Sequence, residues 1–78
     1  MFRAFPKKEV VRKLREQYKK GTLVELVYMN DPYTTLKPGD RGLVDFVDDI
    51  GTIFVNWFNG SHLGVAYGED VVKIVSTN

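Results

Sequence analysis

The stretch from Pro38 to Ser61 constrains the fold most strongly, because turn residues interrupt it at short intervals. Pro38, Gly39 and Asp40 precede one apolar run, residues 48–51 separate it from a second, and Asn59-Gly60 follows. Asn-Gly after a run of β-forming residues predicts a tight hairpin, and we expect a type I′ turn with positive φ at both residues. The stretch therefore predicts short antiparallel strands.

The pattern of branched and aromatic residues predicts five strands, at about residues 22–29, 41–48, 52–58, 61–66 and 71–75. In the third strand Ile53, Val55 and Trp57 share one face, so we assign Trp57 to the core. Gly42 predicts a bulge or a close backbone crossing.

Strands this short bury a core most economically in a bent sheet that closes on itself, and we expect an SH3-like barrel. An OB-like barrel is the alternative, but it needs a helix between the third and fourth strands, where Asn59-Gly60 leaves no room for one.

Residues 6–20 have the pattern of an amphipathic helix. Pro6 suits the first helical position and Gly21 the stop. An apolar stripe is expected to dock on the barrel, and two ion pairs at helical spacing, Glu9 with Lys13 and Glu16 with Lys20, are expected on the surface. The stripe consists of Val10, Val11, Leu14 and Tyr18. The chain is thus predicted to be mainly β with one N-terminal helix, forming a single domain over residues 1–78.

The charges are divided unevenly along the chain. Residues 1–20 carry eight cations and two carboxylates, a net +6, whereas residues 21–78 carry three cations and eight carboxylates, a net −5. Such a division indicates two faces with different partners, or a basic segment that packs near the acidic one. Head-to-tail self-association is a further outcome of the same division.

The absence of cysteine among the 78 residues fits a reducing compartment. The first residues lack the apolar core of a signal peptide, and no apolar run approaches the roughly 20 residues of a membrane helix. We therefore expect a cytoplasmic location and no contact with membranes.

Several segments together match the pattern of a known family in their order and spacing. They are Met29-Asn30-Asp31-Pro32, Pro38-Gly39, Gly42-Leu43-Val44, Val47-Asp48-Asp49-Ile50-Gly51 and Val55-Asn56-Trp57-Phe58-Asn59-Gly60-Ser61. Over roughly residues 7 to 75 the chain resembles a family of small uncharacterised domains from Gram-positive bacteria and their phages and mobile elements. The resemblance implies an SH3-like barrel and assigns no activity. Carriage on mobile elements, which the resemblance implies, fits a role as an accessory factor of the element, and action on a host or defence protein is one such role.

Four cations of the predicted helix fall within a narrow arc at 100° per residue: Lys8, Arg12, Arg15 and Lys19. Such a row is able to contact the phosphates of a nucleic acid or an acidic protein surface. The plainer interpretation is the solvated face that any amphipathic helix must have. Nucleic-acid binding through this row is the alternative to our main functional prediction.

Three aromatic residues lie in or beside predicted loops: Tyr33, Phe58 and Tyr67. Exposed aromatic side chains on loops are suited to anchor a protein partner, and we predict them as partner-binding residues of the barrel. The competing interpretation is partial burial of each ring against its own loop. Phe54 or Phe58 is also a candidate to meet the helix.

Signs of catalysis are few. His62 is the only histidine and reads as a solvent-facing strand residue, and Asp48 and Asp49 read as turn residues. No phosphate loop or metal-ligand spacing occurs, so we expect no cofactor and no metal. The sequence predicts an interaction module that is not an enzyme and binds a protein partner through barrel loops and helix.

Overall fold

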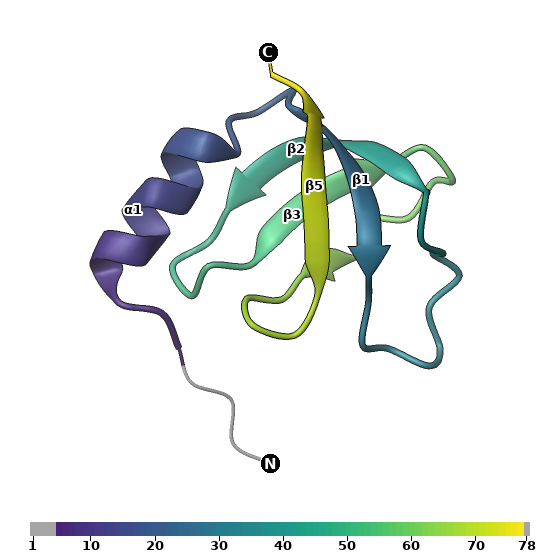
Figure 1. Cartoon of the computed structure of the whole chain (residues 1–78), viewed down its shortest axis with the longest axis horizontal. Helices are drawn as coiled ribbons and strands as arrows, with labels where there is room; N and C mark the ends of the chain where they lie inside the picture. Colours follow the sequence, from purple (N-terminus) through teal and green to yellow (C-terminus); the bar gives the residue numbers. More distant parts are fainter. Residues whose placement is uncertain (1–4, 78) are drawn as a thin grey trace.

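The structure, a computed structural model, describes residues 5–77, so the two ends of the predicted 1–78 domain lie outside the described residues. The chain forms one helix followed by five strands (Figure 1). These are α1 (Lys8–Gln17), β1 (Leu23–Tyr28), β2 (Arg41–Val47), β3 (Ile53–Trp57), β4 (Gly64–Val65) and β5 (Val71–Ser76). Within residues 5–77, no helix has the length and apolar character needed to cross a membrane.

The helix is shorter than the predicted 6–20, because the residues at both of its ends leave helical geometry. Lys7 is extended at the start, and Tyr18 departs at the end with φ −108°. The N–H of Gly21 already donates to the carbonyl of Val44 at 2.8 Å, so residues 18–21 form the turn that leads into the sheet. Gly21 has a φ of +88°, the left-handed stop that the sequence predicts.

The five strands form one antiparallel sheet in the order β4-β3-β2-β1-β5. The sheet is open, because β4 and β5 are its two edges and no pairing joins them in the described residues. The mainly β class is therefore confirmed, whereas the closed barrel is not formed. In Figure 1 β1 and β5 run at a steep angle to β2 and β3.

The fourth strand is much shorter than predicted, because side-chain oxygens accept backbone N–H groups that would pair with β3 in a longer strand. Oδ1 of Asn59 accepts the Ser61 N–H at 2.9 Å, and Oγ of Ser61 accepts the Leu63 N–H at 3.2 Å. Such local bonds compete with ladder formation. β4 begins only at Gly64.

The predicted type I′ turn at Asn59-Gly60 is wrong. Gly60 has a φ of +94°, but no residue other than glycine has a positive φ in the described part of the chain. The Gly60 N–H donates to the Trp57 carbonyl and the Trp57 N–H donates to the Ser61 carbonyl. The loop thus has three residues, with a left-handed glycine at its end, which is the next most common hairpin type.

The core lies between the inward faces of the strands. Its buried members include Val24, Leu26, Val44, Val55 and Trp57, which confirms the place predicted for Trp57. A Cβ on Gly42 would lie 2.6 Å from the backbone oxygen of Asn56, so the predicted close crossing is present there. The register shift lies three residues further on, between Val44 and Phe46.

Candidate functional site

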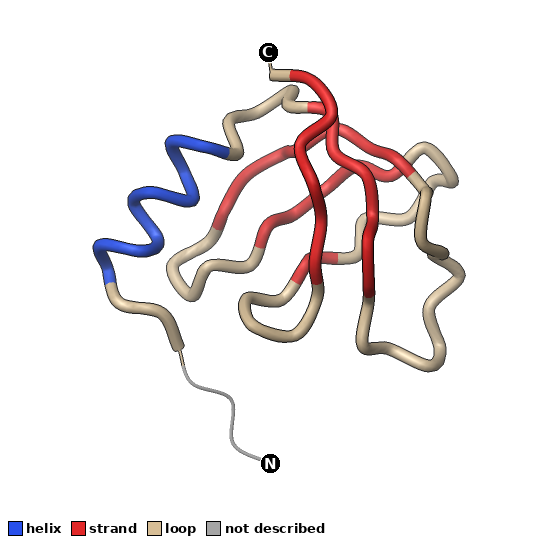
Figure 2. The backbone as a smooth tube through the Cα atoms, viewed as in Figure 1, coloured by secondary structure: helices blue, strands red, loops and turns tan. Residues whose placement is uncertain are grey.

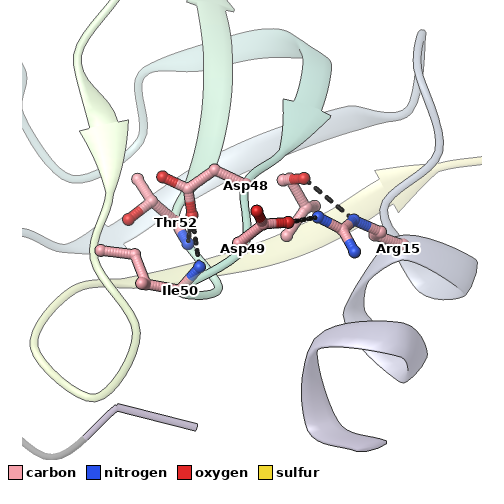
Figure 3. Close-up of polar contacts among 6 residues, drawn as sticks. Arg15, Asp48, Asp49, Ile50 and Thr52 are labelled. Atoms are coloured by element: carbon pink, nitrogen blue, oxygen red, sulfur yellow. Dashed lines mark hydrogen bonds and ion pairs between the residues drawn. The ribbon is translucent and has the colours of Figure 1, made fainter. Parts of the chain in front are cut away.

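Arg15 fastens α1 to the turn between β2 and β3 (Figure 3). Its Nε donates to the carbonyl of Val47 at 3.1 Å, and its Nη2 lies 2.8 Å from Oδ1 of Asp49. Asp48 shapes the turn itself, because its Oδ1 accepts the N–H groups of Ile50 and Thr52. Arg15 thus serves to dock the helix, a contact that sequence reasoning missed.

Arg12 has carboxylate partners on its own helix. Its guanidinium lies 2.8 Å from Glu9 and 2.8 Å from Glu16. Both glutamates contact Arg12, and within the described part of the chain the ion pair predicted between Glu9 and Lys13 is not formed. Two of the four cations in the predicted row are therefore countered within the chain.

Lys8 and Lys19 are the remaining members of the row, and both are exposed. Lys8 borders a shallow hollow of about 380 Å³ together with Val11, Arg15 and Asp49. Lys19 borders a second hollow of about 300 Å³ together with Lys20 and Asp45, whose charged groups lie 3.7 Å apart. The basic N-terminal segment and the acidic sheet are thus in direct contact. This agrees with the interpretation that the basic segment packs near the acidic one.

Tyr33 and Phe58 belong to two neighbouring loops. Tyr33 is 92% exposed in the loop between β1 and β2, and Phe58 is 65% exposed in the turn after β3. Nδ2 of Asn59 lies 3.5 Å from Oγ1 of Thr35, so the two loops are adjacent. In Figure 2 both loops lie on the opposite side of the sheet from α1. We call this region, with Tyr33 and Phe58, the aromatic end.

The backbone of the aromatic end is held by one local hydrogen bond and one bond between strand ends. Oδ1 of Asp31 accepts the Tyr33 N–H at 2.9 Å, and the Phe58 N–H donates to the Arg41 carbonyl at 2.9 Å. These hydrogen bonds fix the backbone at Tyr33 and at Phe58, from which the two rings project. Side chains presented in this way lose little further backbone freedom when they bind.

Tyr67 does not join the other two aromatic residues. It lines an apolar groove of about 300 Å³ between α1 and the two sheet edges. The lining includes Leu14, Tyr18, Ile53, Val65, Tyr67 and Val72. We call it the seam groove, because it lies where a closed barrel would join β4 to β5. The sequence gives no signal for it, since its walls come from four separate elements.

Three charged residues meet on the outer face of the sheet. The carboxylate of Glu25 lies 3.0 Å from Arg41 and 3.2 Å from Lys73. The hydrogen bond from Arg41, and then that from Lys73, hold the pKa of Glu25 below its ordinary value. These residues come from β2, β1 and β5, so only strand pairing brings them together.

Two further side chains clarify the sequence predictions. Phe54 stacks on Phe46 of β2 with ring centroids 4.7 Å apart. His62 is exposed, as predicted, but it precedes β4 and is not a strand residue, and its Nδ1 lies 2.8 Å from Oδ1 of Asn56.

These contacts define a small mainly β domain in which one helix is fastened to an open, five-stranded antiparallel sheet. The chain belongs to the family described as Domain of unknown function (DUF4314), whose family model matches residues 7–75. The match confirms the resemblance to a family of uncharacterised domains. No curated protein and no solved structure matches the chain.

Proposed function

We propose that this domain is a non-enzymatic interaction module that binds a protein partner through the aromatic end. The observation that carries the proposal is the exposure of two rings, 92% for Tyr33 and 65% for Phe58, on adjacent loops whose Asn59 and Thr35 side chains lie 3.5 Å apart. Aromatic rings on a protein surface anchor partners more often than other residue types do. Their large apolar area is in contact with water until a partner covers it.

The proposal extends to the fold. The order β4-β3-β2-β1-β5, with a long first loop and short later turns, supports an SH3-like barrel that is open at one seam. In such barrels the long first loop and the distal turns often form the ligand surface. The loop of Tyr33 and the turn of Phe58 occupy these two places.

The proposed partner has a basic surface around an apolar patch. Residues 21–78 carry a net charge of −5, which favours a cationic partner and disfavours phosphate. The resemblance to domains of phages and mobile elements adds a proposed setting, in which the partner is a host or defence protein. Lys8 and Lys19 of α1, and Tyr67 in the seam groove, are secondary contact candidates.

Nucleic-acid binding through the helix stays the alternative. Its support is weaker than the sequence indicates, because Arg12 and Arg15 are engaged by Glu9, Glu16 and Asp49. The exposed positions of Lys8 and Lys19 are what favour it.

Affinity capture from the natural host, with the whole chain as bait, tests the main proposal. Tyr33→Ala combined with Phe58→Ala should remove a specific captured protein and leave the melting temperature unchanged. Phe5→Ala is the matched control, because Phe5 is 64% exposed but lies next to α1. If the double variant still captures the same protein, or if it unfolds, the aromatic end is not the binding surface.

A further inference from the structure

Two phenylalanine rings are stacked on the outer face of the sheet. Phe46 of β2 and Phe54 of β3 are partners in the strand register, and their ring centroids lie 4.7 Å apart with 19° between the ring planes. The residues beside them in sequence, Val47, Ile53 and Val55, are buried, so both rings lie on the opposite side of the sheet from the core. Phe46 is 51% exposed. We call the two rings the phenylalanine stack.

The strands beside the stack hold its rings in place. Phe54 pairs with Gly64 of β4, and a Cβ on Gly64 would lie 3.2 Å from Cε1 of Phe54. The missing side chain at Gly64 therefore leaves room for the Phe54 ring, against which Phe46 stacks. Rings held in this way lose little freedom when a flat ligand stacks on them.

The exposed Phe46 ring borders a hollow with basic walls. It is the hollow of about 300 Å³ next to the end of α1, and its charged lining residues are Arg15, Lys19, Lys20 and Asp45. Arg15 is countered by Asp49, and Lys20 lies 3.7 Å from Asp45. Among residues 5–77 no carboxylate forms an ion pair with Lys19. An apolar ring and an excess of positive charge thus lie together in one hollow.

The carboxylates of residues 21–78 lie mostly outside the strands. Six of the eight belong to loops and turns: Asp31, Asp40, Asp48, Asp49, Glu69 and Asp70. The strands themselves carry two carboxylates and two cations. The net charge of −5 is therefore mainly a property of the loops. The outer face of the strands is nearly neutral, and Lys19 and Lys20 make the surface around Phe46 basic.

We propose that the phenylalanine stack and the lysines beside it bind single-stranded nucleic acid. A nucleobase stacks on the exposed face of Phe46, and Lys19 and Lys20 contact the phosphates next to that base. A single strand fits this surface because its bases are free to stack on a ring, whereas the bases of a duplex are covered by their neighbours. A nucleotide also supplies a flat ring and an anion within one residue, whereas an acidic peptide needs two residues to supply them.

Polar groups continue the surface along β3. Asn56 follows Phe54 on the same face of the strand, and its Oδ1 lies 2.8 Å from Nδ1 of His62. The amide and the imidazole are both able to form hydrogen bonds with the edge of a base that lies over Phe54. The outer face therefore presents groups for a base edge, a base plane and a phosphate in neighbouring positions.

The inference does not rest on the proposed function, because Tyr33 and Phe58 form the aromatic end and the phenylalanine stack contains neither. It also differs from nucleic-acid binding through the helix row. That alternative needs Lys8 and has no role for Phe46, whereas binding at the stack needs Phe46 and has no role for Lys8.

Fluorescence anisotropy of the whole chain with a labelled single-stranded oligothymidylate of about 12 nucleotides tests the inference. Phe46→Ala should weaken binding about 5- to 150-fold, while Phe46→Tyr, which keeps a flat ring, should bind like the unaltered chain. Lys19→Gln combined with Lys20→Gln should reduce the slope of log K against log salt by about 1.4. Phe58→Ala, at a ring that is 65% exposed elsewhere, and Lys8→Gln are the matched controls and should change neither quantity.

Chemical-shift mapping of the unaltered chain with the same strand gives a second measurement that does not depend on a variant folding. The largest changes should fall on Phe46, Lys19 and Lys20, and changes confined to Lys8 and Arg12, or to the aromatic end, overturn the inference. A duplex of the same length and a polyglutamate peptide of the same charge should compete poorly with the single strand. The inference also fails if either competes equally well, if Phe46→Ala binds as tightly as the unaltered chain, or if the single strand does not bind at low salt.

Discussion

We expect the bond from Arg15 to the Val47 carbonyl, more than the ion pair with Asp49, to hold α1 on the sheet. The side chain of Asp49 is 97% exposed, and an exposed ion pair contributes only about 0 to 1 kcal/mol. A hydrogen bond that involves a charged group contributes about 1.5 to 3 kcal/mol, and Val47 is buried. Arg15→Ala should therefore lower the free energy of unfolding by about 2 kcal/mol, and Asp49→Ala by about 0.5 kcal/mol at most.

Urea denaturation of both single variants and the double variant measures the two contributions separately. The coupling free energy between Arg15 and Asp49 should be about 0.5 kcal/mol or less. Arg12→Ala is the matched control, because it removes two exposed ion pairs within the helix and no contact with the sheet. A loss of about 2 kcal/mol for Asp49→Ala, or a coupling of that size, would refute this assignment of the docking energy.

Two further predictions concern charged groups. The lowered pKa of Glu25 means that folding favours its ionised form, so its contribution to stability is complete above the ordinary glutamate pKa and is lost as the pH falls through the lowered value. In thermal melts from neutral to acid pH, Glu25→Gln should flatten this decline, and a decline parallel to that of the unaltered chain would contradict the role of the Arg41 and Lys73 contacts. Under the nucleic-acid alternative, Lys8→Gln with Lys19→Gln should weaken a gel shift and reduce the slope of log K against log salt by about 2, while Lys37→Gln leaves both unchanged. No shift by the unaltered chain at low salt would rule that alternative out.

Local patterns in the sequence predict the elements well, because they depend on neighbouring residues. The alternation of Ile53, Val55 and Trp57 gives β3 and its buried face, and the apolar spacing around Val11 gives the helix. The exposure of Tyr33 and Phe58 follows from their places beside turns. The helix limits are less accurate, since Tyr18 leaves the helix to meet the turn before Gly21.

Features that depend on distant parts of the chain could not be predicted in this way. The bonds of Arg15 cross more than thirty positions to Val47 and Asp49, so the residue reads in sequence as a surface cation. Tyr67 lies apart from Tyr33 and Phe58, because it borders the groove that forms where α1 packs beside the sheet. The open seam depends on how far β4 extends, which the side chains of Asn59 and Ser61 decide.

The pairing of β1 with β5 also affects the order in which the sheet assembles. Leu23 pairs with Ser76, so this ladder joins opposite ends of the sheet-forming sequence, whereas β2 and β3 are joined by a short turn. Closing a long chain segment costs more entropy than closing a hairpin, and it slows the formation of the contacts that need it. We expect the β2–β3 hairpin to form early and the β1–β5 ladder late.

The edge position of β5 favours local opening of this strand from the native sheet. β5 has a partner on one side only, and most of its side chains remain in contact with water. Segments with few buried contacts unfold locally at a lower free energy than the rest of a domain. When β5 detaches, β1 becomes the edge of a four-stranded sheet. Val24 and Leu26, which are fully buried in the native state, then come into contact with water.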